Sequence, residues 1–159
     1  MNVVRIGIGV AFLADVAMKM WTRQLPADAG RFAFWPSVGP IGIVPSVNDV
    51  LAFSLPVPNV VIWPVGWVVV VWLIARLLRN VKCRTQNAKL TIAFIAIVLG
   101  AVSNLMDRTF LGGVTDYLSF TNLFPAFNIA DLLILGGLAG WIMSERRRTH
   151  DRASGEPQI

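Results

Sequence analysis

Two aspartates flank long apolar stretches of this 159-residue chain: Asp116 follows one stretch, and Asp131 stands near the start of the next. A carboxylate within hydrocarbon is costly unless it is paired or hydrated, so such residues are candidates for function. Two carboxylates held close together share a proton, so one can act as a base on water while the other acts as an acid. We therefore predict a catalytic dyad of Asp116 and Asp131 with the chemistry of an aspartic protease.

Other polar residues recur at helical spacing. Asp15 and Lys19 are four residues apart with the acid first, which favours an ion pair, although Lys19 could instead extend to the membrane interface. Asn104 and Asp107 share a helical face, and the adjacent Arg108 could contact headgroups or a carboxylate.

Asn128 and Asp131 share the first turn of a predicted helix. By themselves they could also be a helix cap followed by an acid that complements the helix dipole. Ala130 between them is small enough for a second chain to approach closely. The motif predicts either a helix cap or part of a site.

The composition excludes most soluble proteins, because 55% of the residues are hydrophobic and only 14% are charged. The net charge of +5 does not indicate nucleic-acid binding, because long apolar segments separate the basic residues. The single Cys83 excludes an internal disulfide, and the single His150 lacks a partner ligand for a metal. We expect neither a metal nor a cofactor.

The elements that must position these residues are four membrane-spanning helices, expected near residues 3–21, 60–78, 88–106 and 127–143. Basic residues gather between the second and third spans and after the fourth, which places both termini in the cytoplasm and residues 22–59 and 107–126 outside. A buried strand pair over 60–78 would leave sheet edges unpaired in lipid.

The first span also resembles a secretory signal ending at Ala27-Asp28-Ala29. Residues 1–145 are expected to form the membrane domain, and the basic tail 146–159 to be disordered.

The order of these motifs resembles the lipoprotein signal peptidases, also called signal peptidase II, which are aspartyl proteases of the bacterial inner membrane. The matching segments, in the order of the family, are Asp15-Val-Ala-Met-Lys19, Asn48 with Ala52-Phe53-Ser54, Asn104-Leu-Met-Asp107-Arg108, Gly112-Gly-Val-Thr-Asp116 and Phe127-Asn128-Ile-Ala-Asp131.

The resemblance implies an all-α membrane protein of four transmembrane helices, with a small outer β-sheet and a short helix from the loop between the first two spans. It implies that Asp116 and Asp131 cleave signal peptides before a diacylglyceryl-modified cysteine. Supporting or substrate-binding roles are implied for Asp15, Lys19, Asn48, Asn104, Asp107, Arg108, Asn128 and Ala130. The implied partners are lipid-modified prolipoproteins and membrane lipid, and we expect a monomer.

Some positions depart from the pattern of the family. Leu99 and Ser103 stand where the family has glycine before the conserved Asn, and Val50 replaces a glycine of the outer loop. Pro56 and Pro58 interrupt the implied short helix. These changes leave the proposed catalytic groups untouched, so an active enzyme is favoured over an inactive lipoprotein-binding relative.

A non-enzymatic carrier or proton relay is the alternative from a different class. A relay needs polar residues at several depths in the membrane, whereas the inner halves of the second and third spans contain none. Aromatic residues near the dyad are typical of the headgroup level, where a lipid-bearing substrate would be held; they are Phe110, Tyr117, Phe120, Phe124 and Phe127.

Overall fold

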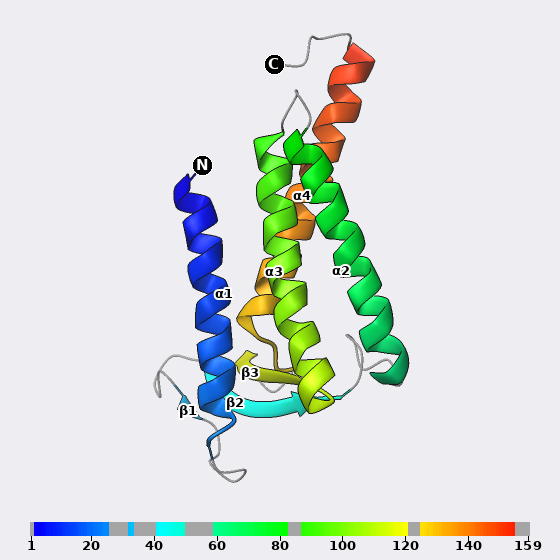
Figure 1. Cartoon of the computed structure of the whole chain (residues 1–159). Helices are drawn as coiled ribbons and strands as arrows, with labels where there is room; N and C mark the ends of the chain where they lie inside the picture. Colours follow the sequence, from blue (N-terminus) through cyan, green and yellow to red (C-terminus); the bar gives the residue numbers. More distant parts are fainter. Residues whose placement is uncertain are drawn as a thin grey trace.

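A computed structural model of the chain describes residues 2–25, 32–33, 41–49, 59–82, 87–120 and 125–154. These residues form four long helices, with a small antiparallel sheet across one end of the helices (Figure 1). The helices are α1 (Asn2–Thr22), α2 (Asn59–Lys82), α3 (Ala88–Leu111) and α4 (Ile129–Ser154). The expected architecture of four helices with a sheet cap is confirmed.

Two of the helices in the described part of the chain are long and apolar enough to cross a membrane by themselves. They are Val60–Lys82 and Ala88–Leu111, with mean hydropathies of 2.1 and 1.9. In α1 the apolar sequence is interrupted by Asp15 and Lys19, but both side chains are buried, at 0% and 2% exposed. Protein therefore covers the charges that would otherwise face hydrocarbon.

Helix α3 is the centre of the bundle and packs against each of the other three helices. Glycines let α4 approach it closely. A Cβ at Gly100 would lie 2.5 Å from the carbonyl oxygen of Ala130, and a Cβ at Gly137 would lie 2.7 Å from that of Ala93. Small residues give helices in a membrane the close packing that holds them together.

The sheet has the order β1 (Phe32–Ala33), β2 (Ile41–Asn48), β3 (Val114–Phe120). The resemblance implied a sheet built from the segment between the first two spans, but β3 comes from the other outer segment and pairs with β2. Asp116 therefore lies on a strand, opposite Ser46, and not in a loop. Several residues named in the sequence analysis lie outside the described residues: Val50, Ala52-Phe53-Ser54, Pro56, Pro58, Ala27-Asp28-Ala29 and Cys83.

A tight reversal at Gly112-Gly113 connects α3 to β3. Gly112 has a φ of 79°, and its N–H donates to the carbonyl of Arg108. A Cβ at Gly113 would lie 3.0 Å from the carbonyl oxygen of Asn48. Glycine at both positions lets β3 turn back directly beneath the helices.

The tail differs from the sequence-based expectation. We expected disorder from residue 146, whereas α4 continues as helix through Ser154. The segment is rich in Arg and contains no Gly or Pro before Gly155, and it extends a helix that is already nucleated.

Adjacent glycines of α4 give a matched test of the contact between α3 and α4. Gly137→Ala should lower the free energy of unfolding by about 1–3 kcal/mol, because the new methyl group meets the backbone of α3. Gly136→Ala is the control, because a Cβ there meets nothing within 4 Å. Thermal unfolding of the purified variants in detergent measures both. Equal midpoints would show that this glycine contact does not limit the packing.

Candidate active site

The ammonium group of Lys19 is buried among polar groups of α1 and α3. Its Nζ lies 3.1 Å from Asp15 Oδ2, and it donates to Ser103 Oγ at 3.0 Å and to Asn104 Oδ1 at 2.7 Å. Asp107 Oδ2 lies 3.5 Å away. Of the two interpretations of the sequence, the ion pair is therefore correct, and Lys19 does not extend to the membrane interface.

This cation determines the orientation of the Asn104 amide. Because the amide oxygen accepts from Lys19, the amide nitrogen points the other way and donates to Asp131 Oδ1 at 2.7 Å. A rotated amide would place its N–H₂ group against an ammonium group, which has no acceptor. Lys19 therefore acts on Asp131 through Asn104.

Asn128 joins the two aspartates of the predicted dyad. Its side-chain nitrogen donates to Asp116 Oδ1 at 2.6 Å, while its side-chain oxygen accepts from the backbone N–H of Asp131 at 2.9 Å. Asp131 Oδ2 in turn accepts from the backbone N–H of Asn128 at 3.1 Å, which completes a reciprocal helix cap. The sequence left a helix cap and a site as alternatives for Asn128 and Asp131. In the structure these two residues form the cap and also belong to the candidate site.

Asp116 projects from β3 and is 4% exposed. Asn48, at the end of β2, donates to its second carboxylate oxygen at 3.2 Å. Burial raises the pKa of Asp116 to about 6, and the negative charge of Asp131 adds to this effect, whereas the hydrogen bonds from Asn48 and Asn128 oppose it. The charge of Asp131 therefore reaches Asp116, which favours holding a proton on this pair.

Asp15 anchors the start of α4. Its Oδ1 accepts from the backbone N–H of Ala130 at 3.1 Å and from the hydroxyl of Tyr117 at 2.8 Å. The Tyr117 hydroxyl also accepts from the backbone N–H of Ile129 at 3.2 Å. A carboxylate at a helix N-terminus is favoured by the helix dipole, so Asp15 fixes the turn that carries Asp131.

Asp107 anchors the start of β3 in a similar way. Its Oδ2 accepts from the backbone N–H of Thr115 at 3.0 Å, and its Oδ1 pairs with Arg23 Nη2 at 2.5 Å. Arg23 also donates to the side chain of Thr115 at 2.9 Å. Asp107 thereby positions the residue that precedes Asp116.

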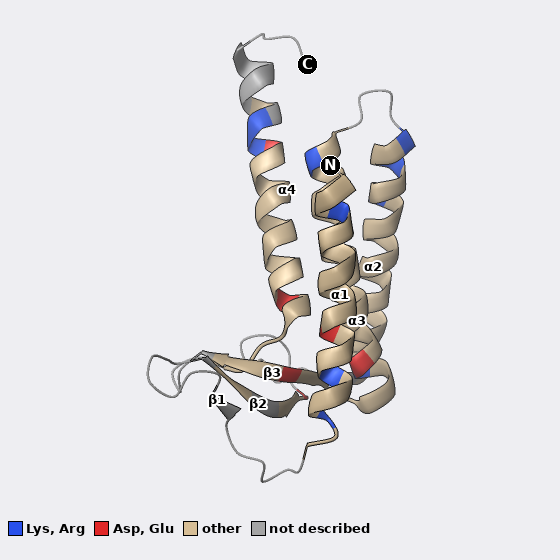
Figure 2. Cartoon of the chain, turned by 90° about the vertical axis from the view of Figure 1, so that its left-hand side faces the viewer, with Lys and Arg blue, Asp and Glu red and all other residues tan. Residues whose placement is uncertain are grey.

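Arg108 is the remaining predicted supporting residue. The carboxylates of Asp116, Asp131 and Asp49 act electrostatically on its guanidinium group. The structure therefore brings together all the predicted site residues at the end of the bundle that carries the sheet, where Figure 2 shows the aspartates of α1, α3, α4 and β3.

Sequence reasoning missed three contributors to this site. Arg23 continues the spacing of Asp15 and Lys19 by four more residues, and that spacing could have identified it. Ser103, treated only as a missing glycine, donates to Asp15 Oδ2 at 2.6 Å. Tyr117 was assigned to the headgroup level, but it is 0% exposed because its hydroxyl binds Asp15.

Comparison with known proteins assigns this chain to a family. The sequence model of the family described as "Signal peptidase (SPase) II" matches residues 8–145. The lipoprotein signal peptidase of Maridesulfovibrio salexigens is 34% identical over 145 residues, which cover 85% of this chain and 89% of that protein. That of Geobacter metallireducens is 39% identical over 77 residues, covering 44% of this chain and 48% of that protein.

A solved structure shows the same fold. The structure of a bacterial membrane enzyme at 2.3 Å resolution superposes with a TM-score of 0.76 and 19% identity, covering 94% of this chain and 90% of that chain. The match over residues 8–145 and the relative that aligns along most of its length establish the family. The chain belongs to the signal peptidase II family of aspartic-type membrane peptidases.

Proposed function

We propose that Asp116 and Asp131 form the catalytic dyad of this lipoprotein signal peptidase. The observation that carries the proposal is the amide of Asn128, which binds the carboxylate of Asp116 and the first turn of Asp131 at once. Each carboxylate oxygen of the pair accepts a hydrogen bond from an N–H group, so both side chains are held in fixed orientations. Preorganised groups of this kind lower the cost of reaching the transition state.

The proposed reaction is hydrolysis by water that the dyad activates. The ionised carboxylate takes a proton from water, whose oxygen attacks the scissile carbonyl carbon, while the protonated carboxyl donates to the carbonyl oxygen. The resulting tetrahedral intermediate collapses when its C–N bond breaks. The amine leaves with the proton that the first carboxylate took from water, and the second carboxylate takes back the proton that it gave to the carbonyl oxygen. The pair needs one shared proton, which agrees with the raised pKa of Asp116.

We propose that the substrate is a diacylglyceryl-modified prolipoprotein, cut immediately before its lipidated cysteine. The family and the names of its relatives support prolipoproteins as substrates. The membrane face near the dyad is apolar: Phe110 is 76% exposed, and Phe127 is half-buried. Phe124 lies outside the described residues. We propose that acyl chains lie against this face while the scissile bond reaches the dyad.

The proposed orientation places the sheet and dyad on the extracytoplasmic side, with both termini in the cytoplasm. Figure 2 supports it, because Lys and Arg of α2, α3 and α4 gather at the end opposite the sheet. The positive-inside rule assigns such an end to the cytoplasm. A substrate translocated across the membrane would then meet the dyad from outside.

A proton relay is less compatible with the packing. The segment between the two ends of the bundle is filled by a buried apolar cluster that includes Leu73, Phe94 and Ile97. Protons cross protein through polar groups or water, which this cluster does not provide.

Asp116→Asn and Asp131→Asn should each abolish cleavage of a lipid-modified prolipoprotein while leaving the protein folded. An amide cannot take a proton from water or share one with its partner. The measurement is the gel shift of the cleaved product with purified protein in detergent, with circular dichroism as the test of folding. The matched control is Glu145→Gln, an acid on α4 near the end of the bundle opposite the dyad, which should retain near-normal turnover. Turnover by either dyad variant would remove that residue from the mechanism.

The pH dependence should follow the proton on Asp116. Because its pKa is raised to about 6, kcat/KM should fall as pH rises above that value, approaching tenfold per pH unit. In the unfolded chain the pKa is about 4, so the stabilisation from this group is full below that pH and is lost as pH rises through about 6. Thermal unfolding of Asp116→Asn should lack this loss. A flat rate profile from pH 5 to 8 would contradict the shared proton.

A further inference from the structure

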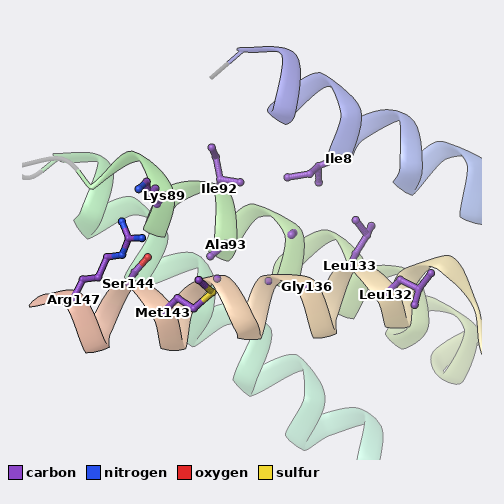
Figure 3. Close-up of a pocket in the computed structure, with 13 residues that line it drawn as sticks. Ile8, Lys89, Ile92, Ala93, Leu132, Leu133, Gly136, Met143, Ser144 and Arg147 are labelled. Atoms are coloured by element: carbon purple, nitrogen blue, oxygen red, sulfur yellow. The ribbon is translucent and has the colours of Figure 1, made fainter.

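An apolar groove runs along α4 from Leu132, the residue after Asp131, to the end of the bundle opposite the sheet. It has a volume of about 460 Å³ and is lined by Ile8 of α1, Ile92 of α3 and Leu132, Gly136 and Gly140 of α4 (Figure 3). The surface of α4 is recessed along the groove because Gly136 and Gly140 have no side chains. A Cβ at Gly136 would meet nothing within 4 Å. The groove can therefore hold a chain that is apolar and narrow.

Cations lie at one end of this groove. Figure 3 shows Lys89 and Arg147 together there, and both residues line the groove. They belong to the end of the bundle opposite the sheet, where basic residues gather (Figure 2). The groove therefore combines an apolar trough with a positively charged mouth.

A third cation stands near the same end. Arg5 lies one helical turn from Ile8 on the same face of α1, toward the N-terminus. Its Nε is buried and has no hydrogen-bond partner among the described residues. Arg5 does not itself line the groove, so it adds positive charge near this end without being a proposed contact of the ligand.

We propose that this groove binds an anionic phospholipid of the leaflet opposite the sheet. One acyl chain lies along Ile92 and Gly136, and the phosphate contacts Lys89 and Arg147. Basic pockets between membrane helices at the cytoplasmic face are suited to anionic headgroups. The helix of a signal peptide fits this mouth less well, because its amino-terminal region is positively charged and would meet two cations.

The test uses the full-length protein in phosphatidylcholine nanodiscs with traces of spin-labelled phosphatidylglycerol or phosphatidylcholine. Electron paramagnetic resonance measures the motionally restricted fraction of each label. The wild type should restrict phosphatidylglycerol preferentially. The double variant Lys89→Gln/Arg147→Gln should reduce that preference about tenfold, since each basic residue near the surface contributes to attraction of anionic lipid.

The matched control is Arg79→Gln/Arg146→Gln, which removes two exposed cations at the same end but outside the groove. It should keep the preference of the wild type. An equal loss in both double variants would mean general surface attraction and would overturn the site.

Gly136→Leu tests the apolar part of the groove separately from its basic end. The new side chain fills the apolar part and leaves Lys89 and Arg147 in place. It should reduce the restricted phosphatidylglycerol severalfold while circular dichroism stays unchanged. Undiminished restriction would overturn the proposal. So would displacement of the lipid label by a synthetic signal peptide, which would assign the groove to the substrate. All readouts are lipid binding, so they remain valid whether or not the dyad assignment holds.

Discussion

The buried ammonium group of Lys19 is the interaction on which the rest of the site depends. A cation at 2% exposure within a membrane protein is tolerated only when opposite charges and acceptors surround it, and here Asp15, Ser103, Asn104 and Asp107 supply them. Asp15, Asn104 and Asp107 each make a second contact outside this cluster, and Ser103 donates to Asp15. The cost of burying the charge is therefore offset by groups that also fix the position of α4, β3 and the Asn104 amide.

These second contacts connect segments that are distant in sequence. Asp15 holds the first turn of α4, and Asp107 holds the start of β3, so α1 and α3 together set the positions of the two segments that carry the dyad. Asn128 then closes the gap between them from its place in the helix cap. The candidate site therefore has one aspartate on a helix and one on a strand, and the Asn128 amide links them.

Much of this arrangement could be predicted from the sequence, because its signals are local. Helical spacing paired Asp15 with Lys19 and Asn128 with Asp131, and hydropathy located the four helices. The placement of Asp116 on a strand could not be predicted, because β3 is stabilised by pairing with β2, about seventy residues earlier. Ser103 was seen only as a departure from glycine, since its hydrogen bonds to Asp15 and Lys19 depend on how α1 packs against α3.

The central claim is that Lys19 orients the dyad through Asn104, beyond merely stabilising the fold. The most direct measurement is kcat of the double variant Lys19→Met/Asp15→Asn against kcat of Asp15→Asn alone, because Asp15 also holds the first turn of α4 by its own hydrogen bonds. We expect both variants to fold and the double variant to be about 100-fold slower than Asp15→Asn, because the Asn104 amide is then free to rotate away from Asp131 and small misplacements of catalytic groups have effects of that size. A folded double variant with the kcat of Asp15→Asn would contradict the claim.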